Sequence, residues 1–248
     1  MSRWKCVCAY DGTDFAGWQT QPTRDAVQDK IEAALAKFLK IPVRIQGSGR
    51  TDAGVHAEGQ VFHFDADWNH DPASLLAAFK VHLPDTILVK SAEEVSSEFH
   101  ARYSATGKRY VYHIFLGQAD PFCTRYALSI PYQLDPEAIR EAGKLLIGTH
   151  DFSAFAADNG NDPETENPVK DFRRFEAELD GQQLMLTFEA SGFMYKMVRS
   201  LVGALLRVGR GKLSQKAFVE ILNSGVRSKD VVTAGPRGLF LKQVYYAE

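Results

Sequence analysis

Residues 46–64 read QGSGRTDAGVHAEGQVFHF, and they join two segments whose residue types are typical of β-strands. Four glycines among small and polar residues predict a chain that turns sharply and brings its backbone close to another group. Arg50 and Asp52 stand two positions apart in this turn, so one loop presents a basic and an acidic side chain. Taken alone, such a loop is most simply an exposed turn with a local ion pair of little energetic weight. Whether it has a larger role depends on the segments around it.

The size and composition of the chain are those of a globular protein. Its 248 residues suit one large domain or two of about 120 residues. Hydrophobic residues make up 45% and charged residues 24%, which is enough to build a sizeable core. No segment approaches the ~18 uninterrupted apolar residues of a membrane span, and the first residues lack a signal-peptide pattern. We therefore expect a soluble cytoplasmic protein.

The three cysteines do not form a pattern that predicts disulfides or a metal site. Cys6 and Cys8 share one face of a strand-like run, and Cys123 is far away in the chain. No Cys/His cluster offers further ligands, so we interpret Cys6 and Cys8 as small buried hydrophobic residues.

Charge is unevenly distributed although the net charge is only −2. Residues 158–189 carry nine acidic and three basic side chains, whereas residues 190–242 carry ten basic and two acidic ones. Such a segregation favours a basic face able to hold a polyanion such as RNA. Two oppositely charged solvated faces are the alternative, and the counts do not exclude it.

The first half of the chain predicts the order strand, helix, strand, strand, helix, strand. This is the βαββαβ order of a ferredoxin-like fold. We expect Asp25 to cap the first helix, with Gln28 at the reciprocal position, and Asp71 followed by Pro72 to begin the second. The expected strands are 4–10, 43–45, 60–64 and one that begins at 87; the expected helices are 26–40 and 72–82.

The second half repeats this plan loosely. We predict an α+β protein with two tandem ferredoxin-like subdomains, 1–106 and 107–248. Their antiparallel sheets are expected to join into one continuous sheet, with helices on one side and an active-site cleft on the other. The only stretch that reads as disordered is 157–167. The expected elements are strands 108–116, 171–179, 184–189 and 239–246, a helix from Asp135-Pro136 to a stop at Gly148, a buried helix 193–208 stopped by Gly209, and a helix capped by Ser214 that ends near Gly225.

Several motifs along the chain together resemble one family, the tRNA pseudouridine synthases of the A type (TruA family). A short Gly-Arg-Thr-Asp alone is a weak signal, but six ordered motifs from residue 10 to about 246 are specific. They are YDGT with Phe15 and GWQ from Tyr10 to Gln19, GRTDAGVHA at 49–57 with GQV and HF following, FHARYSA at 99–105 with KRYVY at 108–112, Gly148 with HDF and Phe155, GFMYKMVR at 192–199 with Gly203 and Gly209, and GLFL at 238–241.

The resemblance implies that uridine is converted to pseudouridine at positions 38–40, in the anticodon arm of tRNA. The N-glycosidic bond breaks, the uracil turns while it is held, and C5 is joined to the ribose. Nothing is consumed, so the resemblance implies neither a metal nor an organic cofactor, and it implies a homodimer that shares one tRNA.

The same resemblance assigns roles to individual residues. Asp52 is the nucleophile, which suits a carboxylate because its reference pKa near ~3.9 leaves it ionised at neutral pH. Arg199 forms an ion pair with Asp52, and Tyr110 stacks on the extruded uracil and is a possible base for the C5 proton. Arg50 keeps the target base out of its stack. The remaining expected contacts are Leu241 to the substrate and Lys108, Arg109 and Lys196 to RNA.

Plainer interpretations of these residues stay open. Arg199 alone would more often be the polar end of a buried helix tied to a backbone carbonyl, and Tyr110 a sheet-packing aromatic. His56, His63 and His100 look like structural hydrogen-bonding groups, since no partner stands at zinc spacing. At the level of function, the alternatives are a tRNA-binding module without chemistry, favoured by the basic C-terminal third, and, more weakly, an aspartyl-phosphate enzyme.

Overall fold

The chain divides into two compact units in the computed structural model, which describes residues 1–157 and 167–247. The first unit contains residues 1–106 and the chain from Phe240 onward, and the second contains residues 107–239. The last residues were expected in the second subdomain. They belong to the first unit because their strand pairs with a strand of that unit.

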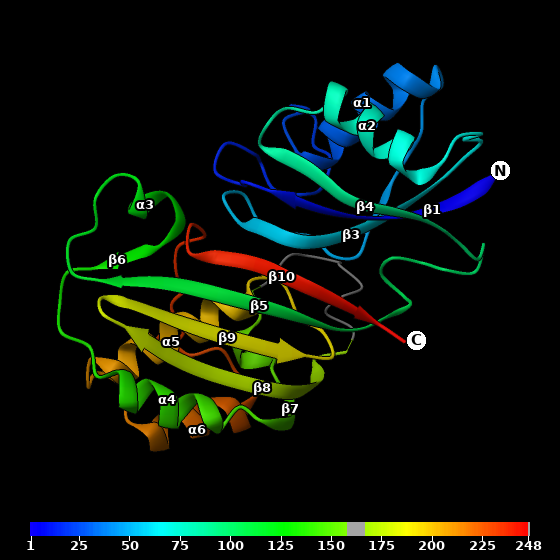
Figure 1. Ribbon diagram of the computed structural model, residues 1–248. Coiled ribbons are helices and arrows are strands. Elements are labelled where there is room, and N and C mark those ends of the chain that lie inside the picture. The colour runs from blue at the N-terminus through cyan, green and yellow to red at the C-terminus, as the bar shows by residue number, and fades with distance from the viewer. Residues whose placement is uncertain (158–166, 248) are drawn as a thin grey trace. The chain divides into compact units, whose positions relative to one another are not determined.

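The first unit is a sheet with two helices on one face, α1 and α2 (Figure 1). Strand β1 pairs antiparallel with β4 on one side and with β3 on the other, and β2 adds to β3. The final strand of the chain, β10, runs parallel to β3. The elements are β1 (Ser2–Tyr10), α1 (Val27–Leu39), β2 (Gln46–Gly47), β3 (His56–Ala66), α2 (Pro72–His82), β4 (Ile87–Val95) and β10 (Leu239–Tyr246).

The core of this unit lies between its sheet and its helices. Phe62 and Phe64 of β3 both make T-shaped ring contacts with Phe79 of α2, at centroid distances of 6.2 and 6.4 Å. Cys6 and Cys8 are fully buried, as expected, and burial raises the pKa of both thiols. They therefore act as small apolar side chains.

The second unit is a sheet of mostly antiparallel strands with helices α4, α5 and α6 (Figure 1). Strand β9 pairs antiparallel with β5 on one side and with β8 on the other, and β8 pairs antiparallel with β7. The short strand β6 runs parallel to β5. Helix α5 is buried almost all round, as its apolar sequence predicted. The elements are β5 (Ala105–Leu116), α3 (Cys123–Tyr126), β6 (Leu128–Ile130), α4 (Pro136–Lys144), β7 (Gly148–Asp151), η1 (Ser153–Phe155), β8 (Val169–Asp180), β9 (Gln183–Ala190), α5 (Met197–Gly209) and α6 (Gln215–Ser224).

Two expectations for the first unit were wrong. Residues 43–45 form no strand, and only Gln46 and Gly47 pair with β3. The cap of α1 is Ala26, whose N–H donates to the carboxylate of Asp29 at 3.1 Å. Gln28, expected in that role, is buried and accepts the N–H of Thr20 instead.

Two expected helix limits in the second unit were also wrong. Helix α4 ends at Lys144, because the next amides donate three residues back, and Gly148 opens β7 with φ +118°. Helix α5 begins only at Met197, because Lys196 has a left-handed φ of +56°. A residue in this conformation interrupts a right-handed helix. Most of the stretch expected to be disordered lies outside the described residues.

Candidate active site

Asp52 lies on the loop between β2 and β3, where its side chain is half-buried. The loop turns at this point, since the N–H of Val55 donates to the carbonyl of Asp52 at 3.1 Å. Gln60, which is fully buried, donates its amide to the carbonyl of Gly49 at 2.8 Å. The loop is therefore held at its start by the side chain of Gln60 and in its turn by a backbone hydrogen bond.

The YDGT and GWQ motifs form the support of this loop. The position of a Cβ on Gly12 would lie 1.9 Å from the carbonyl oxygen of Val55, and one on Gly17 would lie 2.6 Å from that of Thr51. Gly17 also has a φ of +94°, a conformation that favours glycine. The hydroxyl groups of Tyr10 and Thr51 are 2.8 Å apart in a buried hydrogen bond. Both glycines thus allow two backbone segments to meet, Gly17 at Thr51 and Gly12 at Val55, on either side of Asp52.

Two further predicted residues lie in the first unit. The side chain of Arg50 is exposed on the same loop as Asp52. Leu241 lies on β10, paired with Ala57 of β3, and is fully buried. Next to it, Phe240 stacks on His56 with a centroid distance of 4.5 Å. The last strand therefore packs on the chain that leaves the Asp52 loop.

Tyr110 lies in the second unit, in the middle of β5. It pairs in register with Phe188 of β9 and is 7% exposed. The edge of Phe193 meets its ring at 5.1 Å. An aromatic side chain in this position packs on the sheet, as the plainer interpretation held, and that packing also fixes the orientation of the ring.

Arg199 lies in the first turn of α5 and is half-buried. Its Nε donates to the carbonyl of Ala234 at 2.8 Å, and the N–H of Ala234 donates to the carbonyl of Arg199 at 2.9 Å. The hydrogen bond from Arg199 to a backbone carbonyl, which the plainer interpretation expects, is therefore present. It uses the Nε proton, and it sets the direction of the rest of the guanidinium.

The expected RNA-binding residues of the second unit differ in their surroundings. Arg109 is paired with Glu189 across β5 and β9, with 2.9 Å between Nε and Oε2. Lys108 is half-buried beside it. Lys196 holds its ammonium 4.7 Å from the ring centroid of Tyr195. Asp52, Arg50 and Leu241 thus lie in the first unit, and the other predicted site residues lie in the second.

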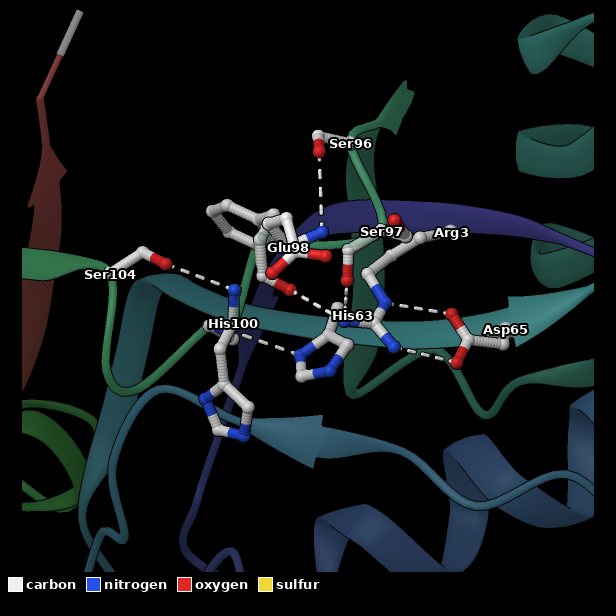
Figure 2. A network of polar contacts seen from close by, with 10 residues as sticks. Arg3, His63, Asp65, Ser96, Ser97, Glu98, His100 and Ser104 are labelled. Carbon is white, nitrogen blue, oxygen red and sulfur yellow. Dashed lines mark hydrogen bonds and ion pairs between the residues drawn. The ribbon is translucent and has the colours of Figure 1, made fainter.

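The three histidines make backbone hydrogen bonds, as expected. His56 Nδ1 accepts the N–H of Gly12 at 3.1 Å, and His63 Nδ1 accepts that of Ala101 at 3.1 Å. His100 Nδ1 accepts the N–H groups of Arg102 and Tyr103. The sequence motifs gave no indication of the polar network around His63 and His100, which Figure 2 shows together with Arg3 and Asp65.

The network in Figure 2 predicts a pH-dependent stability. Burial lowers the pKa of His63 from 6.5 to about 4, and the nearby cation of Arg3 and the ring of His100 act in the same direction, against Asp65. Because the folded-state pKa is below the unfolded one, the stabilisation is complete above about pH 6.5 and is lost as the pH falls toward 4. We expect a loss on the order of 1–3 kcal/mol in the free energy of unfolding between pH 7 and 4.5.

Urea unfolding of the wild type and of His63→Gln at both pH values measures this loss. Glutamine has a carbonyl oxygen that can accept the Ala101 N–H but no group that titrates in this range. The wild type should lose more stability than the variant on acidification. Equal losses would show that His63 does not titrate differently in the folded and unfolded chain.

The comparisons with known proteins point to one family. The family model described as "tRNA pseudouridine synthase" matches residues 7–104 and 142–247. This chain belongs to that family. Its relatives include the tRNA pseudouridine synthase A of Exiguobacterium sibiricum, 43% identical over 100% of this chain and 98% of the relative. The protein of the same name from Streptococcus mutans is 41% identical over 99% of both chains.

Family membership makes the protein an isomerase that forms pseudouridine from uridine in tRNA. The matched ranges include the loop of Asp52 in the first unit and helix α5 with Arg199 in the second. Within the residues that the structure describes, no helix has the length and apolar character needed to cross a membrane.

Proposed function

We propose that this pseudouridine synthase acts on uridines 38–40 in the anticodon arm of tRNA, with Asp52 as its nucleophile. The observation that carries the proposal is the support of the Asp52 loop. Backbone contacts at Gly12 and Gly17 and the buried Tyr10–Thr51 hydrogen bond hold in one position the backbone that carries Asp52, whose side chain is half-exposed. A catalytic group needs such a fixed position, because proximity and orientation account for much of the rate enhancement of enzymes.

The reaction breaks one bond to the ribose and forms another. Asp52 captures or stabilises the electron-poor C1′ when the bond to N1 of uracil breaks. The detached uracil turns, C5 bonds to C1′, and C5 then gives up its proton while N1 gains one. Since a carboxylate is ionised at neutral pH, Asp52 needs no activating base. Tyr110 is proposed to stack on the uracil and to assist removal of the C5 proton through its hydroxyl.

We assign to Arg199 the ion pair with Asp52. Its fixed Nε supports this assignment, because an arginine held at one nitrogen presents its remaining donors in a defined direction. Arg50, exposed on the Asp52 loop, is suited to keep the target base out of its stack. Leu241 would contact the substrate, and Lys108, Arg109 and Lys196 would bind RNA.

We further propose that both units are ferredoxin-like, that their sheets join, and that the site lies in the cleft so formed. The strand order β4-β1-β3-β2 of the first unit, antiparallel throughout and with both helices on one face, supports this for that unit. A cytoplasmic homodimer that shares one tRNA completes the proposal. Sedimentation at micromolar concentration should give a species of twice 27.6 kDa, and a monomer alone would contradict it.

Release of tritium from tRNA labelled at C5 of uridine tests the activity, and mapping of pseudouridine in the product tests the position. We expect release, with the new pseudouridines at positions 38–40. Pseudouridine at other positions only would contradict the assignment to the anticodon arm. A tRNA-binding module without chemistry, the alternative considered from the basic C-terminal third, would release no tritium, and family membership does not favour it.

A further inference from the structure

An exposed tyrosine stands on an otherwise well-held loop of the first unit. The side chain of Tyr103 is 78% exposed. It lies between β4 and β5, in the segment from Ser96 to Ser104. Leaving an aromatic ring in water forgoes the free energy that its burial would contribute, so its position needs a reason other than packing.

One end of this segment is fixed by Arg3. The guanidinium of Arg3 makes two hydrogen bonds of 2.7 Å to Asp65, in the paired geometry visible in Figure 2. It also donates to the carbonyl groups of Ser97 and Phe99. A side chain from β1 thus holds backbone almost a hundred positions later in the chain.

The other end is fixed around Ala101. Its N–H donates to His63, and its carbonyl accepts the hydroxyl of Tyr246 at 2.7 Å. Burial raises the pKa of Tyr246, which therefore stays protonated and able to donate. The N–H of His100 donates to Ser104 Oγ at 3.0 Å (Figure 2). Three strands of the unit, β1, β3 and β10, therefore determine the course of this segment.

The ring of Tyr103 is itself oriented by His100. The two ring centroids are 4.3 Å apart with an interplanar angle of 31°. His100 also accepts the N–H of Tyr103 at 3.2 Å, so that one imidazole fixes both the backbone and the ring. Burial lowers the pKa of His100, which keeps this acceptor neutral near pH 7. The guanidinium carbon of Arg102 lies 5.8 Å from the ring centroid.

We propose that Tyr103, backed by His100 and flanked by Arg102, is a stacking platform for an unpaired base of the tRNA substrate. The inference rests on the activity proposed above and names a contact outside its catalytic residues. RNA-binding proteins recognise splayed bases by stacking them on aromatic rings, and a nearby arginine adds a cation–π contribution. A ring whose orientation is already fixed loses little conformational entropy when a base stacks on it.

An RNA base fits this surface better than a protein partner does. Protein interfaces bury a cluster of apolar residues at their centre. Here the residues next to the exposed ring of Tyr103 in the sequence, Arg102 and Ser104, are both polar. One aromatic face is sufficient for a base.

Substitution of Tyr103 in the full chain tests the platform. Tyr103→Ala should raise the Kd for tRNA about tenfold, and raise KM with little change in kcat, because the stacked base is held equally in the bound substrate and in the transition state. Tyr103→Phe should keep wild-type affinity. Kd is measured with tRNA that the enzyme has already modified, so that binding is separated from turnover. The slope of log Kd against log salt concentration should not change, since a stacked base releases no counterions.

Tyr126→Ala is the matched control. Tyr126 is also exposed (43%) and lies 5.9 Å from the guanidinium carbon of Arg125, but it stands on the four-residue helix α3. Its removal should leave the Kd unchanged. A tRNA with 5-iodouridine in its unpaired loops should cross-link on irradiation to wild-type protein at Tyr103, and the cross-link should be absent from Tyr103→Ala.

Three results would overturn the platform. The first is a wild-type Kd for tRNA in Tyr103→Ala. If the wild-type protein still releases tritium, this result refutes the platform and leaves the proposed activity intact. The second is an equal loss in the Tyr126 variant, which would indicate a general surface effect. The third is a change of oligomeric state in Tyr103→Ala without a change in RNA affinity, which would assign the ring to a protein contact.

Discussion

Replacing Asp52 by Asn should reduce tritium release by at least about a thousandfold and leave the Kd for tRNA within about threefold of the wild type. Asparagine keeps the size and hydrogen-bonding reach of the side chain but is neither a nucleophile nor an anion. It cannot capture C1′ or balance the positive charge that develops there. The substitution removes an interaction made in the transition state, so the loss falls on kcat and not on binding.

The control for this experiment is Asp25→Asn, which makes the same chemical change at an exposed carboxylate outside the Asp52 loop. It should be fully active. Wild-type turnover in Asp52→Asn would refute the assignment of the nucleophile. Loss of tRNA binding in that variant would instead assign Asp52 a role in holding the substrate or the fold.

Gly17→Ala should lower kcat about a hundredfold, although Gly17 touches no substrate in the proposed mechanism. The new Cβ would stand 2.6 Å from the carbonyl oxygen of Thr51 and 3.1 Å from the carbonyl carbon of Asp52, both backbone atoms. The Asp52 loop must move to make room, and a displacement of about 1 Å at a reacting group costs on the order of a hundredfold in rate. The left-handed φ of +94° adds a destabilisation of roughly 1–3 kcal/mol.

Gly181→Ala separates these two effects. Gly181 also has a positive φ, +55°, but apart from its two chain neighbours no atom of the described residues lies within 4 Å of the position that a Cβ would take. This variant should lose about 1 kcal/mol of stability in urea and keep its activity. If both alanine variants were fully active at a temperature where they are folded, the Asp52 loop would not depend on its contact with Gly17.

Much of the fold could be predicted because its signals are local. The Asp71-Pro72 start of α2, the Ser214 cap of α6 and the Asp180-Gly181 hairpin were all confirmed, since each depends on a few adjacent residues. The wrong predictions concern segments whose structure depends on contacts with residues far away in the sequence. Residues 43–45 have the composition of a strand, but their backbone is not paired in the sheet. The apolar periodicity of α5 extends back to Phe193, yet the left-handed turn at Lys196 delays the helix.

The candidate site shows the same division. The motif at 49–57 predicted Asp52 as the catalytic residue, because its neighbours in sequence are unusual. The sequence did not reveal that Gly12 and Gly17 support the loop, since both contacts join segments about 40 positions apart. Nor did it reveal that Arg3 and Asp65 hold the loop of Tyr103, because each residue alone is an ordinary surface charge.

The pairing of β10 with β3 affects how the first unit folds during synthesis. The first 106 residues leave the ribosome long before the last strand, yet β3 pairs with Phe240 and Leu241. Until Phe240 and Leu241 have been made, the edge of β3 that pairs with β10 is unoccupied, and His56, next to the Asp52 loop, lacks the ring of Phe240. Exposed strand edges promote aggregation, so nascent chains are at risk over this interval. Translation that stops before Phe240 would therefore yield a chain whose defect lies in β3, more than 170 positions earlier in the sequence.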